Sequence, residues 1–145
     1  MKDNLIDYLE VIGITITIRE RIEKIFQFYR KICTDEITDI FITDYRKEDN
    51  TREYENLWFF SEKYCMEAKQ FITKDNFDIT PIRNRIIHWA IQKQDYDFKK
   101  AREKSRLYLQ IRLDTGISGD FKSSNENCDY LRDIIKKYVM PNLKE

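Results

Sequence analysis

The sequence predicts an α+β fold: one antiparallel sheet or partly open barrel of about seven short strands, N-terminal helices and a capped C-terminal helix. Three observations predict it. Apolar residues recur at helical spacing near both ends, they alternate in the middle, and no helix separates the strands. The 145 residues are typical of a single domain. We divide it into an N-terminal helical extension, 1–34, and a sheet with its closing helix, 35–145.

Two helices are expected in the N-terminal extension. The first covers residues 4–12, and Gly13 ends it in a backbone conformation that glycine tolerates. The second covers residues 18–33, because Thr17 and Glu20 have the spacing of a capping box. Its apolar stripe fits packing on the chain's own sheet or contact with a second subunit, and both interpretations stay open. The stripe contains Ile18, Ile22, Ile25, Phe26, Tyr29 and Ile32.

The middle of the chain is rich in β-branched and aromatic residues. Residues 37–45 and 53–60 predict a hairpin. Residues 64–71 fit a third strand, although their Met, Glu, Ala, Lys and Gln also favour a helix, and both interpretations stay open. Residues 76–82 fit a short strand, which a proline restricts to an edge or an end. Residues 85–94 favour a strand over two turns of helix.

The clearest alternation covers residues 107–113, where Leu and Ile occupy every second position. This pattern predicts a half-buried strand, and residues 119–123 fit the strand that returns from it. Ser123 and Glu126 repeat the capping-box spacing. They predict a terminal amphipathic helix over residues 126–139.

This order of elements resembles the pleckstrin-homology superfold, including its bacterial and GRAM-type members. Leu57 to Met66 are similar to an apolar strand, a hydroxyl-led turn and a second strand of those domains. Leu107 to Val139 are similar to their last strands and closing helix, so the resemblance covers about Asp35 to Leu143. It implies a module that binds proteins. Members that bind phosphoinositides carry basic residues around the first hairpin, whereas residues 45–52 here balance bases with acids.

The composition describes a well-solvated globular protein. Its 26 basic and 26 acidic side chains cancel, and its 14% aromatic content excludes a disordered chain. No apolar run is long enough to span a bilayer, and the acidic N-terminus does not fit a signal peptide, so we expect a cytoplasmic protein without a transmembrane segment. The odd number of cysteines, Cys33, Cys65 and Cys128, favours reduced and buried thiols.

We predict no catalytic residues, no metal and no cofactor. A single histidine, His88, excludes a two-histidine metal site, and the three glycines do not form a phosphate-binding loop. Pairing His88 with a cysteine as base and nucleophile is a less favoured interpretation than a core histidine. A metal-dependent nuclease site of Asp39, Glu53 and Lys69 is a second alternative, weighed against a solvated charged surface.

The predicted function is therefore binding, to a protein partner or to a second copy of the chain. The alternative is a phosphate ligand, a lipid headgroup or nucleic acid, bound by the basic run 99–106. The aromatic cluster 54–64 fits either core or interface. The candidate ligand-binding residues are Lys99, Lys100, Arg102, Lys104, Arg106, Arg83 and Arg85.

Overall fold

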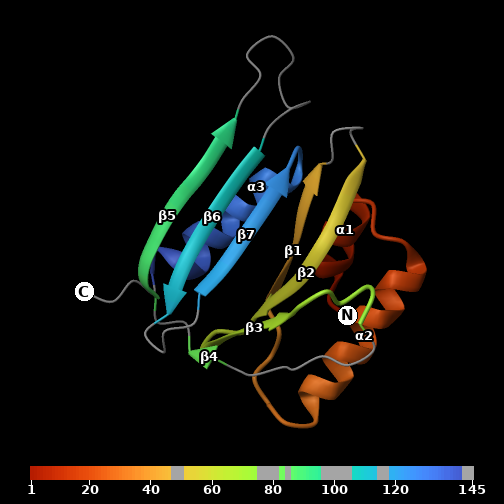
Figure 1. Cartoon of the computed structure of the whole chain (residues 1–145). Coiled ribbons are helices and arrows are strands. Elements are labelled where there is room, and N and C mark those ends of the chain that lie inside the picture. Colours follow the sequence, from red (N-terminus) through yellow and green to blue (C-terminus); the bar gives the residue numbers. More distant parts are fainter. Residues whose placement is uncertain (47–50, 75–81, 84–85, 96–105, 114–117, 142–145) are drawn as a thin grey trace. The chain divides into compact units, whose positions relative to one another are not determined.

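A computed structural model of the protein describes residues 1–46, 51–74, 82–83, 86–95, 106–113 and 118–141 (Figure 1). The helices are α1 (Asp3–Val11), α2 (Ile16–Arg30) and α3 (Asn127–Ile134), with a π-helical turn, η1 (Ile135–Val139), following α3. The strands are β1 (Asp39–Arg46), β2 (Arg52–Phe60), β3 (Tyr64–Ala68), β4 (Ile82–Arg83), β5 (Ile86–Asp95), β6 (Arg106–Leu113) and β7 (Ser118–Ser124).

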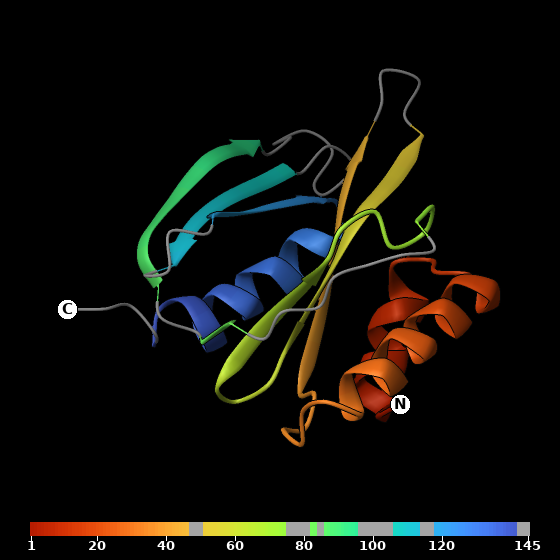
Figure 2. The ribbon, with the colours of Figure 1, turned by 60° about the horizontal axis from the view of Figure 1, so that its bottom comes forward.

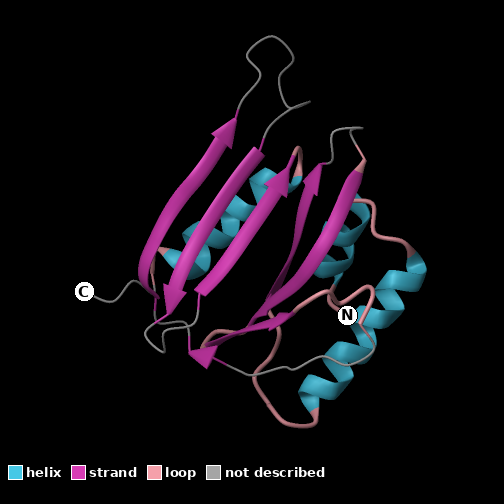
Figure 3. Ribbon diagram, viewed as in Figure 1, coloured by secondary structure: helices cyan, strands magenta, loops and turns pink. Residues whose placement is uncertain are grey.

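The α+β class is confirmed, as Figure 3 shows by colour, but the strands belong to two sheets rather than to one sheet or partly open barrel. One sheet has the order β1-β2-β3-β4 and the other the order β5-β6-β7. At the end of β7, side chains of Asp44 and Arg52 bind the N–H and the carbonyl oxygen of Ser124. A further strand would bind these groups through its backbone, so the side chains replace strand pairing there.

The chain divides into two compact units. The first contains residues 1–42 and 55–82, and the second contains residues 43–54 and 83–145. The division passes through β1 and β2, so each unit contains part of both strands. The helices predicted as an extension belong to the first unit, while the single-domain organisation stays a prediction.

In the first unit, α1 and α2 pack against the strands of their own unit (Figure 2). The Phe59 ring contacts two rings of α2, with centroid distances of 5.4 Å to Phe26 and 5.5 Å to Tyr29. The backbone N–H of Ile42 donates to the Tyr8 hydroxyl of α1 over 2.9 Å. Aromatic packing and this buried hydrogen bond therefore attach both helices to β1 and β2.

The start of α2 differs from the prediction. The helix begins at Ile16, and the Thr15 hydroxyl accepts a 3.4 Å hydrogen bond from the Ile18 N–H. The N-cap is therefore Thr15 and not Thr17, because a cap needs an extended backbone, which Thr15 has. Regular helix ends at Arg30 and not at Cys33, and Ile32, the last residue of the predicted apolar stripe, is exposed.

In the second unit, β5, β6 and β7 pair antiparallel, and α3 lies across one face of this sheet (Figure 2). The predicted alternation of β6 is confirmed: Leu107, Leu109 and Ile111 are buried, while the residues between them are partly exposed. Leu109 lies opposite Phe121 in the register. The sheet thus has one apolar face, which α3 covers with Leu131 and Ile134 among its buried residues.

Most other predicted elements are confirmed within a few residues. Residues 64–68 form a strand, not a helix, and β5 confirms the strand preference for residues 85–94. Of the strand predicted over 76–82, only Ile82 lies among the described residues, where it begins β4.

We expect Phe59→Ala to lower the free energy of unfolding by about 3–5 kcal/mol, because it opens a cavity among the rings of Phe26 and Tyr29. Phe28→Ala is the matched control, since Phe28 lies on the same helix as those rings but is 52% exposed. We expect it to change the free energy by less than about 1 kcal/mol. Urea unfolding followed by circular dichroism measures both, and equal losses would contradict the packing described.

Candidate functional site

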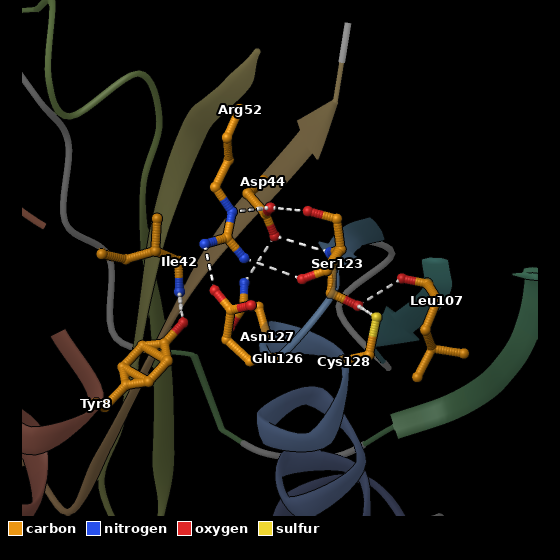
Figure 4. Close-up of polar contacts among 10 residues, drawn as sticks. Tyr8, Ile42, Asp44, Arg52, Leu107, Ser123, Glu126, Asn127 and Cys128 are labelled. Atoms are coloured by element: carbon orange, nitrogen blue, oxygen red, sulfur yellow. Dashed lines mark hydrogen bonds and ion pairs between the residues drawn. The ribbon is translucent and has the colours of Figure 1, made fainter. Parts of the chain in front are cut away.

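The second unit contains a buried carboxylate, Asp44, whose side chain is fully enclosed (Figure 4). One of its oxygens accepts hydrogen bonds from the Ser124 N–H at 3.0 Å and from Asn127 Nδ2 at 2.8 Å. The other accepts from Arg52 Nε at 2.7 Å and from the Ser124 hydroxyl. Four donors thus occupy the acceptor positions of one carboxylate.

Arg52 extends this network. Its Nη1 lies 2.6 Å from Glu126 Oε1, and its Nη2 donates to the Ser124 carbonyl oxygen at 3.0 Å. Burial alone lowers the pKa of Arg52, but Asp44 and Glu126 outweigh that effect and raise the pKa above its usual range. The guanidinium therefore stays charged, and the pair connects the β1–β2 tip to the junction of β7 and α3. This network therefore links these elements of the second unit.

The same network explains why the predicted capping box of Ser123 and Glu126 is absent. Ser123 is buried, and its hydroxyl donates to the Leu107 carbonyl oxygen at 2.9 Å and contacts the Cys128 sulfur at 3.4 Å. Glu126 occupies the N-cap position itself and binds Arg52. A tertiary ion pair therefore replaces the local cap.

Most of the predicted ligand-binding residues lie outside the described residues, namely Lys99, Lys100, Arg102, Lys104 and Arg85. Arg83 belongs to β4, and Arg106 is half-buried at the start of β6, opposite Ser124. The structure therefore does not test the basic run as a binding site.

The residues of the nuclease alternative are placed on different strands. Asp39 begins β1 and Glu53 lies in β2, both half-buried. Lys69 follows β3, is 74% exposed, and lies 4.0 Å from Glu67. His88 belongs to β5. Among the residues that the structure describes, no group of three or more His, Cys, Asp and Glu side chains could hold a metal ion.

The aromatic cluster belongs to the core. Trp58, Phe59 and Phe60 are all buried, and Tyr54 and Tyr64 are half-buried. The interface interpretation of the three consecutive aromatic residues is therefore wrong. The exposed aromatic side chain that the sequence analysis missed is Phe28, on α2.

A pocket of about 410 Å³ opens in the first unit beside the end of α2. It is lined by the half-buried thiol of Cys33 and by charges of both signs, including Arg30 and Asp35. Lys2 and Glu36, also in its lining, form an ion pair of 3.0 Å. Because these charges balance, the pocket does not favour an anion or a cation.

The strongest candidate for an external contact is the solvent-exposed side of α2. Phe28 is 52% exposed and Ile32 is 60% exposed, four residues further on. Lys24, four residues before Phe28, and Lys31, between Phe28 and Ile32 in the sequence, are also exposed. We name Lys24, Phe28, Lys31 and Ile32 the α2 surface. Residues four apart are neighbours on a helix, so Phe28 and Ile32 form an apolar centre, and the lysines form a cationic edge on one side of it.

The helical turn that carries this surface continues past Arg30. The N–H groups of Ile32 and Cys33 both donate to the Tyr29 carbonyl oxygen, at 3.0 and 2.9 Å. Tyr29 is itself fixed, since its hydroxyl donates to the Asp35 carbonyl oxygen at 3.1 Å. The spacing of Phe28 and Ile32 is therefore set by a buried and hydrogen-bonded residue between them.

No family model, no curated protein and no solved structure matches this chain. The resemblance to the pleckstrin-homology superfold stays a prediction. No helix within the described ranges has both the length and the apolar character needed to cross a membrane.

We expect Asp44→Asn to lower the free energy of unfolding by about 3 kcal/mol or more, because it leaves the buried Arg52 charge without its main partner. Asp129→Asn is the matched control. It removes an exposed ion pair with Arg132, 3.0 Å long, and costs less than about 1 kcal/mol. Chemical denaturation of both variants measures the difference, and a loss for Asp44→Asn no larger than the control would contradict the structural role.

The three cysteines are expected to differ in reactivity. Burial raises the pKa of Cys65 to about 12 and also raises that of Cys128, so both thiols stay protonated in the folded protein near pH 8. Cys33 is the accessible thiol. A chromogenic disulfide reagent should therefore label one thiol rapidly in the native state and all three in guanidinium chloride. Rapid native labelling of Cys65 or Cys128 would refute this.

Proposed function

We propose that the protein is a non-catalytic interaction module that binds a protein partner through the α2 surface. The observation that carries the proposal is the exposure of Phe28, near the end of α2, and of Ile32, in the turn that follows the helix. Ile22 and Phe26 of α2 are buried, and Ile16, which is also exposed, lies at the opposite end of the helix. Adjacent exposed apolar side chains with a polar rim are typical of interaction sites.

The energetics support this choice. Burying apolar surface contributes about 25 cal/mol per Å², and an aromatic residue beside a branched aliphatic one is a common centre of a binding site. The Tyr29 ring of α2 packs edge-on against the Phe59 ring of β2, with an angle of 86° between the ring planes. This contact holds the helix against the strand. A rigid helix loses little conformational entropy on binding, so more of the contact energy appears as affinity.

A separate observation supports a non-catalytic function. The most elaborate polar arrangement in the described part of the chain is the network of Asp44 and Arg52, and its groups bind each other. Binding of a phosphate ligand by the run 99–106 stays a separate prediction, as does the pleckstrin-homology resemblance.

Photocrosslinking tests the proposal. We expect the chain with p-benzoylphenylalanine in place of Phe28 to form discrete protein adducts in its source cell, because this position lies inside the contact. The matched control carries the same residue at Val11 of α1, which is 51% exposed. The adducts are identified by mass spectrometry.

An excess of unlabelled wild-type protein should suppress the position-28 adducts, whereas a Phe28→Ser, Ile32→Ser variant should not. Either the same adducts from position 11, or no adduct from position 28, would contradict binding through the α2 surface.

A further inference from the structure

We infer that the partner presents an acidic amphipathic segment, whose apolar side chains cover Phe28 and Ile32 and whose carboxylates face Lys24 and Lys31. This inference rests on the proposed function and adds the chemistry of the partner. It follows from the arrangement of charge around the apolar centre.

The two lysines lie close to Phe28, on one side of the apolar pair. At 100° per residue, Lys24 lies about 40° and Lys31 about 60° around the helix from Phe28, on the same side of it. Each is about one turn from Phe28 along the axis. Both side chains are exposed, and neither forms an ion pair with another described residue. Their charges are thus available to a partner.

A second basic element lies beside the first half of α2. Arg21, two turns before Phe28, donates from Nε to the Phe71 carbonyl oxygen at 2.9 Å and from Nη2 to the Lys74 carbonyl oxygen. These bonds fix the segment after β3 against the helix. Lys74 is exposed there, so it extends the positive charge beyond the α2 surface.

The charge pattern argues against two other occupants. A second copy of the chain would add the same positive charge beside the interface, and like charges near an interface oppose binding. An anionic membrane requires a continuous apolar and basic face, whereas Glu20 and Gln27 are exposed beside Lys24. An anionic surface would also cover Glu20, whereas a peptide can place its carboxylates opposite Lys24 and Lys31 alone.

Two labelled helical peptides of about 18 residues test the inference by fluorescence anisotropy. Both have the same leucine stripe, flanked by glutamates in one and by lysines in the other. We expect wild-type protein to bind the acidic peptide about tenfold more tightly than the basic one, with a preference that falls as salt increases.

Two variants provide the controls. Lys24→Glu, Lys31→Glu should reverse the preference, because the apolar centre is intact and only the edge charge changes. Phe28→Ser, Ile32→Ser should weaken binding of both peptides about tenfold or more. Circular dichroism checks that each variant folds.

Equal affinity of wild-type protein for the two peptides, or no binding of either, would overturn the acidic-partner inference. Adducts at position 28 would still leave the proposed function standing. Tight binding to phosphatidylserine vesicles that Lys24→Glu, Lys31→Glu abolishes, or dimerisation that Phe28→Ser, Ile32→Ser abolishes, would also overturn the inference.

Discussion

The buried carboxylate of Asp44 is the constraint around which the second unit is organised. A charge enclosed this completely is tolerated only when donors surround it, and the protein supplies them from Arg52, Ser124 and Asn127. Because these donors come from different elements, their hydrogen bonds to Asp44 hold the end of β7, the start of α3 and the tip of the β1–β2 hairpin together. It also means that side chains, and not a further strand, bind the N–H and the carbonyl oxygen of Ser124 at the end of β7.

The first unit depends instead on aromatic packing, and this leaves one side of α2 to solvent. Phe26 and Tyr29 contact Phe59, which sets the rotation of the helix about its axis. With that rotation fixed, Phe28 points away from the core, and Ile32 follows it by four residues. The unit thus pairs a rigid support with an exposed apolar centre, which is the combination that binding surfaces use.

Local patterns predicted the elements well, and failed where distant residues decide. The alternation around Leu109 and the stripe around Ile22 report burial directly, so β6 and α2 were predictable. The capping box predicted for Ser123 and Glu126 is absent, because Arg52, 74 residues away in the sequence, binds the Glu126 carboxylate. Ile32 has the same helical spacing as the core residues. That spacing shows which side of a helix faces the core, but it does not show where the element that covers this side ends. Phe28 falls outside the stripe, and that position was the available signal for the α2 surface.

The central claim is that α2, and not the basic run or the second unit, forms the binding surface. Amide chemical-shift mapping with the acidic amphipathic peptide tests it most directly, because each backbone N–H reports its own surroundings. The account predicts shifts concentrated in residues 21–33 and around Lys74, with β6 and β7 unchanged. Shifts concentrated in residues 99–106 or on β6 and β7, with α2 unchanged, would contradict it.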